Sequence, residues 1–210
     1  MKIISVNVGM PRLVEYNGEP IATAIYKNPV EGKVKVNPLN LAGDAQADLR
    51  VHGGASKSVY AYPFEHYEFW QTEYPNKDLP IAIFGENLTT EGILETEICA
   101  GDKIRVGTAE FIVTEPRFPC FKLGIRFDRK DIIRRFQKSR RSGFYLAVAK
   151  VGEIEAGDAI EFVEREPHRV TIEELVRLSD DKNVLEIARR ALKVEALPER
   201  WKQHIRKMFD

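Results

Sequence analysis

This sequence is poor in cysteine, since Cys99 and Cys120 are the two that occur among its 210 residues. Two cysteines are too few for the disulfide framework of a small secreted protein, and no secretory signal precedes the first strand-like segment. No apolar run reaches the roughly 20 residues that a membrane-spanning helix needs. We therefore expect a cytoplasmic protein with reduced thiols and no membrane partner.

A net charge is also missing, because Lys plus Arg and Asp plus Glu each number 32. A balanced chain has no overall field that would draw it to DNA or to an anionic membrane. One segment is locally basic and carries seven cations: Arg129, Lys130, Arg134, Arg135, Lys138, Arg140 and Arg141. Asp128 and Asp131 offset part of this charge. A solvated helix face is therefore the favoured interpretation, and nucleic acid is the less favoured partner.

Short β-branched or alternating runs separated by turn residues dominate the first three quarters of the chain, and they predict strands. The predicted strands cover residues 2–8, 13–16, 21–26, 33–36, 58–62, 97–115 and 143–148. Asn17-Gly18 between two of them predicts a hairpin. An aromatic-rich helix over 64–74 should belong to the core, and a basic helix should follow at 131–139. Many short strands favour a barrel or folded sheet.

The pattern changes from period two to a helical period after Glu166-Pro167. Capping boxes and a proline mark the starts of three amphipathic helices: Thr171 with Glu174, Asn183 with Glu186, and Pro198. Three short helices bury little on their own. We expect a mostly β domain over residues 1–165 and a three-helix segment over 168–210 that packs on this domain or forms a homodimer.

A long polar loop over residues 39–54 is the first candidate for function, because such loops inside compact domains are usually functional or disordered. Its polar and glycine residues, with the lysine that follows, are Asp44, Gln46, Asp48, Arg50, His52, Gly53, Gly54 and Lys57. The glycine pair can aim backbone N–H groups at an anion, and the cations add positive charge. A phosphate-bearing ligand suits this loop, although the spacing is not that of a P-loop. A glycine turn with solvated charges is the alternative.

The second candidate is Cys120, which follows Pro116 and Pro119. Proline cannot continue regular structure here, so we expect a rigid, extended loop over 116–124 at a strand end. Arg117 lies nearby in sequence, and a cation lowers the pKa of a neighbouring thiol, whose thiolate attacks or ligates metal. The local pattern leaves open that Cys120 is a small buried core residue.

A zinc site is a further possibility that the residue types allow. Its ligands would come from His52, His66, Asp44, Asp48, Glu65 and Cys120. None of them stands at the tight spacing of a structural zinc motif. A single soft sulfur better suits a metal whose other ligands come from a cofactor.

Three motifs in order resemble the MOSC domain (molybdenum cofactor sulfurase C-terminal), in its stand-alone bacterial form linked to resistance against N-hydroxylated purine bases. They are Gly43-Asp44-X-Gln46-X-Asp48 through His52-Gly53-Gly54-X-X-Lys57-X-X-Tyr60, then Phe84-Gly85-Glu86-Asn87-Leu88, then Pro116-Arg117-X-Pro119-Cys120. The C-terminal segment is similar to the small helical extension of that form.

The resemblance implies a β-barrel-like MOSC domain that binds the molybdenum cofactor (molybdopterin) and does not depend on pyridoxal phosphate. Cys120 would be the metal ligand and the catalytic residue. The residues that would bind the cofactor are Asp44, Gln46, Asp48, Arg50, His52, Gly53, Gly54, Lys57, Glu86, Asn87 and Arg117. Arg117 then becomes an anion contact rather than a tuner of the thiol pKa.

The activity that the resemblance implies is reduction of N-hydroxylated small molecules, such as hydroxylaminopurine bases, to amines. The sequence has no flavin or iron–sulfur motif, so the electrons would come from a separate reductase. The alternative is a non-catalytic carrier of the molybdenum cofactor, or of sulfur held as a Cys120 persulfide.

Overall fold

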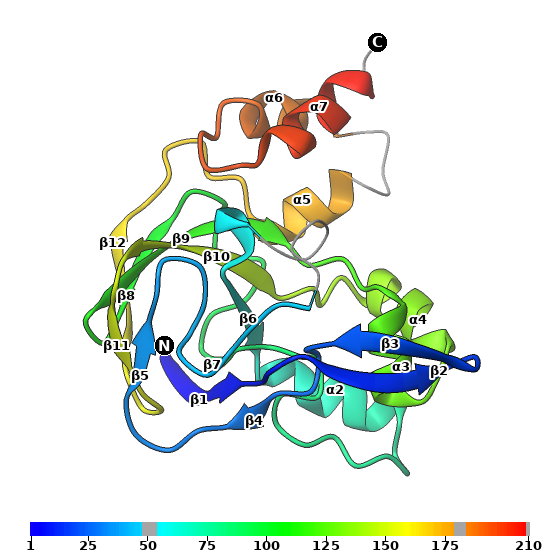
Figure 1. The fold of residues 1–210 in the computed structure, drawn as a ribbon. Coiled ribbons are helices and arrows are strands. Elements are labelled where there is room, and N and C mark those ends of the chain that lie inside the picture. Colours follow the sequence, from blue (N-terminus) through cyan, green and yellow to red (C-terminus); the bar gives the residue numbers. More distant parts are fainter. Residues whose placement is uncertain (48–53, 179–183, 209–210) are drawn as a thin grey trace.

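A computed structural model describes residues 1–47, 54–178 and 184–208 (Figure 1). Its centre is an eight-stranded sheet with the order β12-β8-β9-β10-β6-β7-β1-β4, in which β6 and β7 are parallel and the other neighbours antiparallel. The strands are β1 (Lys2–Val8), β4 (Asn28–Pro29), β6 (Val59–Pro63), β7 (Leu88–Glu91), β8 (Lys103–Val106), β9 (Ala109–Pro116), β10 (Phe144–Lys150) and β12 (Ile160–Glu164). The fold is therefore dominated by this sheet and also contains helices, as the expected mostly β class gives in part.

The sheet curls but forms no closed barrel within the described residues, because β12 and β4 are its edges. Its curvature brings β1 beside the turn that precedes β12. The N–H of Ile3 donates to the carbonyl of Asp158 over 2.9 Å, and the N–H of Gly157 donates to Ile3 over 2.8 Å. Gly157 has a φ of 94°, as its turn requires, and just after this turn an isolated antiparallel bridge joins Lys2 to Ala159, while Ile160 at the start of β12 donates to Met1 over 3.1 Å. The β-barrel-like expectation is therefore corrected to a curled, open sheet.

Two small strand pairs flank this sheet. The predicted hairpin is present as β2 (Arg12–Tyr16) and β3 (Glu19–Thr23). Asn17 and Gly18 both have positive φ, 54° and 81°, as a two-residue turn of the primed type requires. β5 (Val34–Val36) pairs with β11 (Gly152–Ile154).

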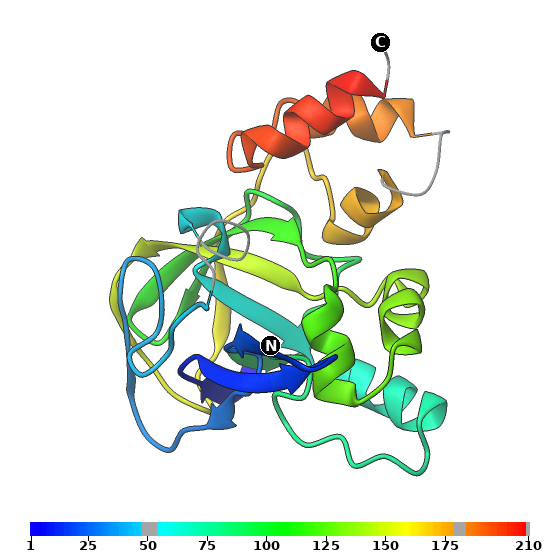
Figure 2. The ribbon, with the colours of Figure 1, turned by 45° about the vertical axis from the view of Figure 1, so that its right-hand side comes forward.

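The described residues hold six α-helices, which is more helix than the expected three-helix extension. They are α2 (Glu65–Glu73), α3 (Phe121–Phe127), α4 (Asp131–Ser139), α5 (Ile172–Leu178), α6 (Leu185–Ala191) and α7 (Glu199–Lys207), besides the short 3₁₀ turn η1 (Ala55–Lys57). α2, α3 and α4 gather at one side of the sheet, and α5, α6 and α7 stack above it (Figures 1 and 2). Among the described helices, none has both the length and the apolar character needed to cross a membrane.

The extended loop predicted over 116–124 is shorter than expected. β9 ends at Pro116 and α3 begins at Phe121, so residues 117–120 form the loop. Leu123 and Phe127 lie one turn apart on α3 and are both buried. Their burial explains the helix, since apolar residues at i and i+4 share one helix face.

The core has two parts. One joins the sheet to α5, α6 and α7 through apolar residues such as Phe111, Leu175 and Ile205. The other is aromatic and lies among α2, α3 and α4. Trp70 of α2 is fully buried there and donates from Nε1 to the hydroxyl of Tyr62 over 2.6 Å. The prediction that the aromatic helix belongs to the core is confirmed for Tyr67, Trp70 and Tyr74, whereas Phe64 before the first turn of α2 is exposed.

Candidate functional site

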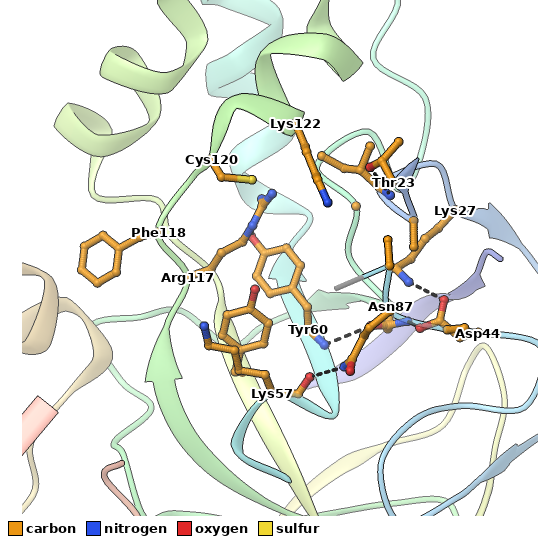
Figure 3. A pocket seen from close by; sticks show the side chains of 17 residues that line it. Thr23, Lys27, Asp44, Lys57, Tyr60, Asn87, Arg117, Phe118, Cys120 and Lys122 are labelled. Carbon is orange, nitrogen blue, oxygen red and sulfur yellow. Dashed lines mark hydrogen bonds and ion pairs between the residues drawn. The ribbon is translucent and has the colours of Figure 1, made fainter. Parts of the chain in front are cut away.

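A cavity of about 110 Å³ opens between the start of α3, strand β6 and the loop after β3 (Figure 3). It contains residues from both candidate segments of the sequence. The predicted site residues that line it are Asp44, Gln46, Lys57, Asn87, Arg117 and Cys120. We call this cavity the Cys120 pocket.

Cys120 is the residue before α3, and its backbone is extended, with φ −120° and ψ 173°. Its side chain is partly buried. The sulfur, the guanidinium of Arg117 and the ammonium of Lys122 point toward the same part of the pocket, whereas Phe118 points away from it (Figure 3). The loop and the first turn of α3 thus present a thiol and two cations together.

Arg117 is a buried cation, with 7% of its surface exposed. Its guanidinium lies 4.8 Å from the ring centre of Tyr60 and 5.5 Å from that of Phe136. In the described part of the chain, no carboxylate lies within ion-pair distance of it. A buried charge without an opposite charge is costly unless a ligand supplies one. Arg117 is therefore placed to bind an anion.

Two further lysines line the pocket. Lys57 is the last residue of η1 and is half-buried. Burial lowers its pKa, while the negative fields of Glu115 and Cys120 oppose this shift. Lys27 is almost fully buried and forms an ion pair with Asp44. Burial lowers the pKa of Lys27 too, although Asp44 opposes it.

Asp44 and Asn87 form the frame behind these lysines. Asp44 accepts hydrogen bonds from the backbone N–H of Gly9 (2.9 Å) and from Nδ2 of Asn87 (2.9 Å). The amide oxygen of Asn87 in turn accepts from the N–H of Tyr60 at 3.1 Å. Because these bonds are all internal, both side chains fix the shape of the pocket and the position of Lys27.

Glu86 is fully buried and is not among the residues that line the pocket. Its Oε1 accepts hydrogen bonds from the hydroxyl of Tyr67, from the N–H of Ala82 (3.2 Å) and from Thr89 Oγ1 (3.2 Å). Burial raises its pKa, against the effect of these hydrogen bonds. Glu86 therefore lies in the protein interior behind the lining of the pocket, and its side chain does not form part of the pocket surface.

Gln46 and Gly54 are the remaining described members of the polar loop. Nε2 of Gln46 donates to the carbonyl of Lys57 over 2.8 Å and so connects the loop to η1. Gly54 precedes η1 with a φ of 96° and does not line the pocket. The other predicted members, Asp48, Arg50, His52 and Gly53, lie outside the described residues.

The zinc alternative finds no support within the described residues, which contain no group of three or more His, Cys, Asp or Glu that could hold a metal ion. His66 is instead paired with Glu95, with 2.7 Å between Nε2 and Oε2. Cys99 is buried, and burial followed by the field of Asp102 raises the pKa of its thiol to about 11. Cys120 is therefore the thiol that is suited to chemistry.

Some residues of the pocket were not predicted: Lys27, Tyr60, Lys122 and Tyr145. Two of them had a signal in the sequence, since Lys122 stands next but one to Cys120 and Tyr60 belongs to the motif that includes Lys57. Lys27 lies far from both motifs, and its pairing with Asp44 brings it into the site. Tyr145 enters because β10 pairs with β6 and places it opposite Tyr60.

This donor set fits a thiophilic metal that arrives in an anionic organic group. Cys120 offers one soft sulfur, and Lys57, Arg117 and Lys122 offer positive charge around it. The one carboxylate among the described lining residues, Asp44, is occupied by Lys27. The volume of about 110 Å³ holds the immediate surroundings of a metal, so a larger group would extend beyond the pocket.

Comparisons with known proteins identify the family of the chain. The sequence profile of the MOSC domain matches residues 48–161. The uncharacterized protein YflK of Bacillus subtilis is 38% identical over 99% of this chain and 94% of its own length. A reductase of Gibberella moniliformis is 33% identical over 87% of this chain, which corresponds to 33% of that protein.

The fold is shared with a solved structure as well. The crystal structure of YiiM from Geobacillus stearothermophilus superposes with a TM-score of 0.83 at 28% identity, covering 100% of this chain and 99% of that one. The profile match spans more than half of the chain and includes the segment with Arg117 and Cys120. The chain belongs to the MOSC domain family.

Proposed function

We propose that this protein is a molybdenum-cofactor-dependent reductase of N-hydroxylated compounds, including hydroxylaminopurine bases. The observation that carries the proposal is the Cys120 pocket, where one thiol lies among Arg117, Lys57 and Lys122. Membership of the MOSC family supports a role connected with the molybdenum cofactor. A relative described as a reductase supports the type of reaction.

The pocket residues have distinct tasks in this proposal. Cys120 is the protein ligand of molybdenum, and its place at the junction of the loop with α3 fixes its direction before the metal binds. Arg117 and the lysines attract the anionic pterin and its phosphate. Asp44 and Asn87 hold Lys27 and the wall of the pocket and make no contact of their own with the cofactor.

When bound, a molybdenum pterin supplies two-electron chemistry that removes an oxygen atom from an N–OH group. The net reaction takes R–NHOH, two electrons and two protons to R–NH₂ and water. The sequence contains no flavin or iron–sulfur motif, so the electrons come from a separate reductase. The residues of the Cys120 pocket would bind the cofactor and hold the thiol beside Arg117 and Lys122, where it can ligate the metal.

The proposal is tested by expressing the protein in a host that makes molybdopterin. Molybdenum and pterin are then measured per chain for the wild type, Cys120→Ala and Cys99→Ala. Reduction of 6-N-hydroxylaminopurine is followed with a reduced viologen dye as donor. Cys99→Ala is the matched control, because it removes the other cysteine at a buried site apart from the pocket.

We expect equimolar molybdenum and turnover in the wild type and in Cys99→Ala, and loss of both in Cys120→Ala. Wild-type protein without molybdenum, or full activity in Cys120→Ala, contradicts the proposal. Bound cofactor without turnover under any donor supports the carrier function in its place.

A further inference from the structure

A second cavity, of about 410 Å³, lies next to the Cys120 pocket and between α4, α5 and the loop 117–120. The two cavities share Arg117 and Phe118. The residues that give the second one its character are Arg117, Phe118, Arg134, Phe136, Lys138 and Arg140. Among the described residues that line it, none is acidic. A recess of this size suits a small organic molecule rather than a flat protein surface.

The cations that the basic segment 129–141 contributes to this cavity differ in their pairing from the other cations of that segment. Arg134 and Lys138 are one helical turn apart and so share a face, and neither forms an ion pair with a described residue. Arg140 reaches Glu173 of α5 at 3.4 Å, but both side chains are partly exposed, so this pair is weak. The charge on the cavity wall is therefore largely uncompensated.

Arg129 and Arg135 of the same basic segment are paired. Arg129 bonds Asp131 at 2.8 Å, and Arg135 bonds both Asp131 (2.9 Å) and Glu73 (2.5 Å). Neither arginine lines the second cavity. The basic segment thus has one set of cations neutralised on the surface and another set turned toward a recess.

Phe118 stands between the two cavities. It is 43% exposed, which is high for a phenylalanine, and it points away from the Cys120 pocket (Figure 3). Its ring centre lies 5.7 Å from that of Trp201, which holds it from the side of α7. A fixed, exposed aromatic ring beside a cluster of cations suits a ligand that joins an aromatic base to a phosphate.

We propose that the second cavity binds the phosphate of an N-hydroxylated nucleoside monophosphate, so that nucleotides are preferred to free bases as substrates. This inference rests on the proposed function. The hydroxylamino group enters the Cys120 pocket, the base passes Phe118, and the phosphate meets Arg134, Lys138 and Arg140. The cofactor phosphate already has the cations of the Cys120 pocket.

The test compares the cofactor-loaded protein on N6-hydroxyadenosine and on its 5′-monophosphate, with a reduced viologen dye as donor. The variant of interest is Arg134→Gln with Lys138→Gln. The matched control is Arg129→Gln with Arg135→Gln, which removes the same charge from the same basic segment outside the cavity. We expect kcat/KM for the monophosphate to exceed that for the nucleoside by at least about tenfold in the wild type and the control, because charge-assisted hydrogen bonds are strong.

In Arg134→Gln/Lys138→Gln that preference should vanish, while turnover of the nucleoside stays unchanged. Equal kcat/KM for the two substrates in the wild type overturns the inference. It is also overturned if the variant loses molybdenum, which would assign the cavity to the cofactor. If the variant shows normal kinetics with the dye but slow kinetics with a protein donor, the cavity is assigned to an acidic partner protein. This result would overturn the inference as well.

Failure of the proposed function is recognised separately, as absence of turnover of both substrates by wild-type protein. Calorimetric titration with adenosine 5′-monophosphate then tests the cavity alone. Binding by the wild type and the control but not by Arg134→Gln/Lys138→Gln supports the phosphate site. Equal binding, or no binding, by all three proteins overturns it.

Discussion

The indole nitrogen of Trp201 in α7 donates a hydrogen bond of 3.0 Å to Oε2 of Glu115, which is buried near the end of β9. The same carboxylate forms an ion pair with Arg200 and accepts a hydrogen bond of 3.3 Å from Ser56 in η1. Glu115 lies two residues before Arg117. The last helix therefore joins η1, whose Lys57 lines the Cys120 pocket, to the end of β9, directly before Arg117.

Replacing Trp201 tests this connection. Trp201→Phe removes the hydrogen bond to Glu115 but keeps a ring against Phe118, and we expect it to lower the free energy of unfolding by about 1 kcal/mol. Trp201→Ala also leaves a cavity, and we expect it to lower the free energy of unfolding by about 3–5 kcal/mol. Urea denaturation measures both values. Stability equal to that of the wild type in Trp201→Ala would show that α7 contributes nothing to the folded domain.

Glu86 predicts a dependence of stability on pH. Burial raises its pKa, so between about pH 4.5 and the raised pKa the folded chain holds a proton that the unfolded chain has lost. Its stabilising contribution is complete below this range and is lost as pH rises through the folded pKa. Glu86→Gln keeps an acceptor for the Tyr67 hydroxyl and cannot titrate. Relative to this variant, the wild type should lose stability from pH 4.5 upward.

Chemical denaturation at several pH values, with Glu161→Gln as an exposed control, measures this effect. The difference in the free energy of unfolding between Glu86→Gln and the wild type should grow with pH, by up to about 1.4 kcal/mol for each unit by which the pKa is raised. Parallel curves for the wild type and Glu86→Gln would mean that Glu86 titrates at its ordinary pKa in the folded protein.

Local features of the fold could be predicted because their signals lie within a few residues. Asn17-Gly18 carries the backbone freedom that its turn needs, and the hairpin is present. α3 was missed for the opposite reason. Pro116 and Pro119 dominate the local pattern, and the burial of Leu123 and Phe127 that stabilises the helix depends on tertiary contacts.

Residues of the candidate site that belong to a sequence motif could be predicted. Residues that reach the pocket through contacts with distant parts of the chain were missed. Cys120, Arg117 and Lys57 meet in one cavity as expected. Lys27 reaches that cavity through an ion pair with Asp44, and the residues next to Lys27 in the sequence do not predict this position. Glu86 shows the reverse. It stands in a family motif, yet its contacts within the described residues are made beneath the pocket.

The capping box at the start of α5 gives a third prediction. Oγ1 of Thr171 accepts from the N–H of Glu174 at 3.1 Å, and Glu174 Oε2 accepts from the N–H of Thr171 at 3.0 Å. Thr171→Ala should cost about 1 kcal/mol of stability, and Thr171→Ser clearly less. Thermal and urea unfolding of the two variants provide the measurement. Equal losses in both would trace the effect to the methyl group and not to the cap.

The two cysteines should differ in reactivity in protein prepared without cofactor. Cys120 is partly exposed beside Arg117 and Lys122, whereas Cys99 is fully buried and its thiol pKa is raised to about 11. Because the thiolate is the reacting form, iodoacetamide at pH 7.5 should modify Cys120 at least about tenfold faster than Cys99. Peptide mass spectrometry over time separates the two rates, and Cys99→Ala should leave the fast phase intact. Raising the phosphate concentration should slow the modification of Cys120, because an anion bound at Arg117 occupies the pocket that the reagent must enter. Equal rates for the two cysteines in folded protein would contradict the distinction on which the assignment of Cys120 depends.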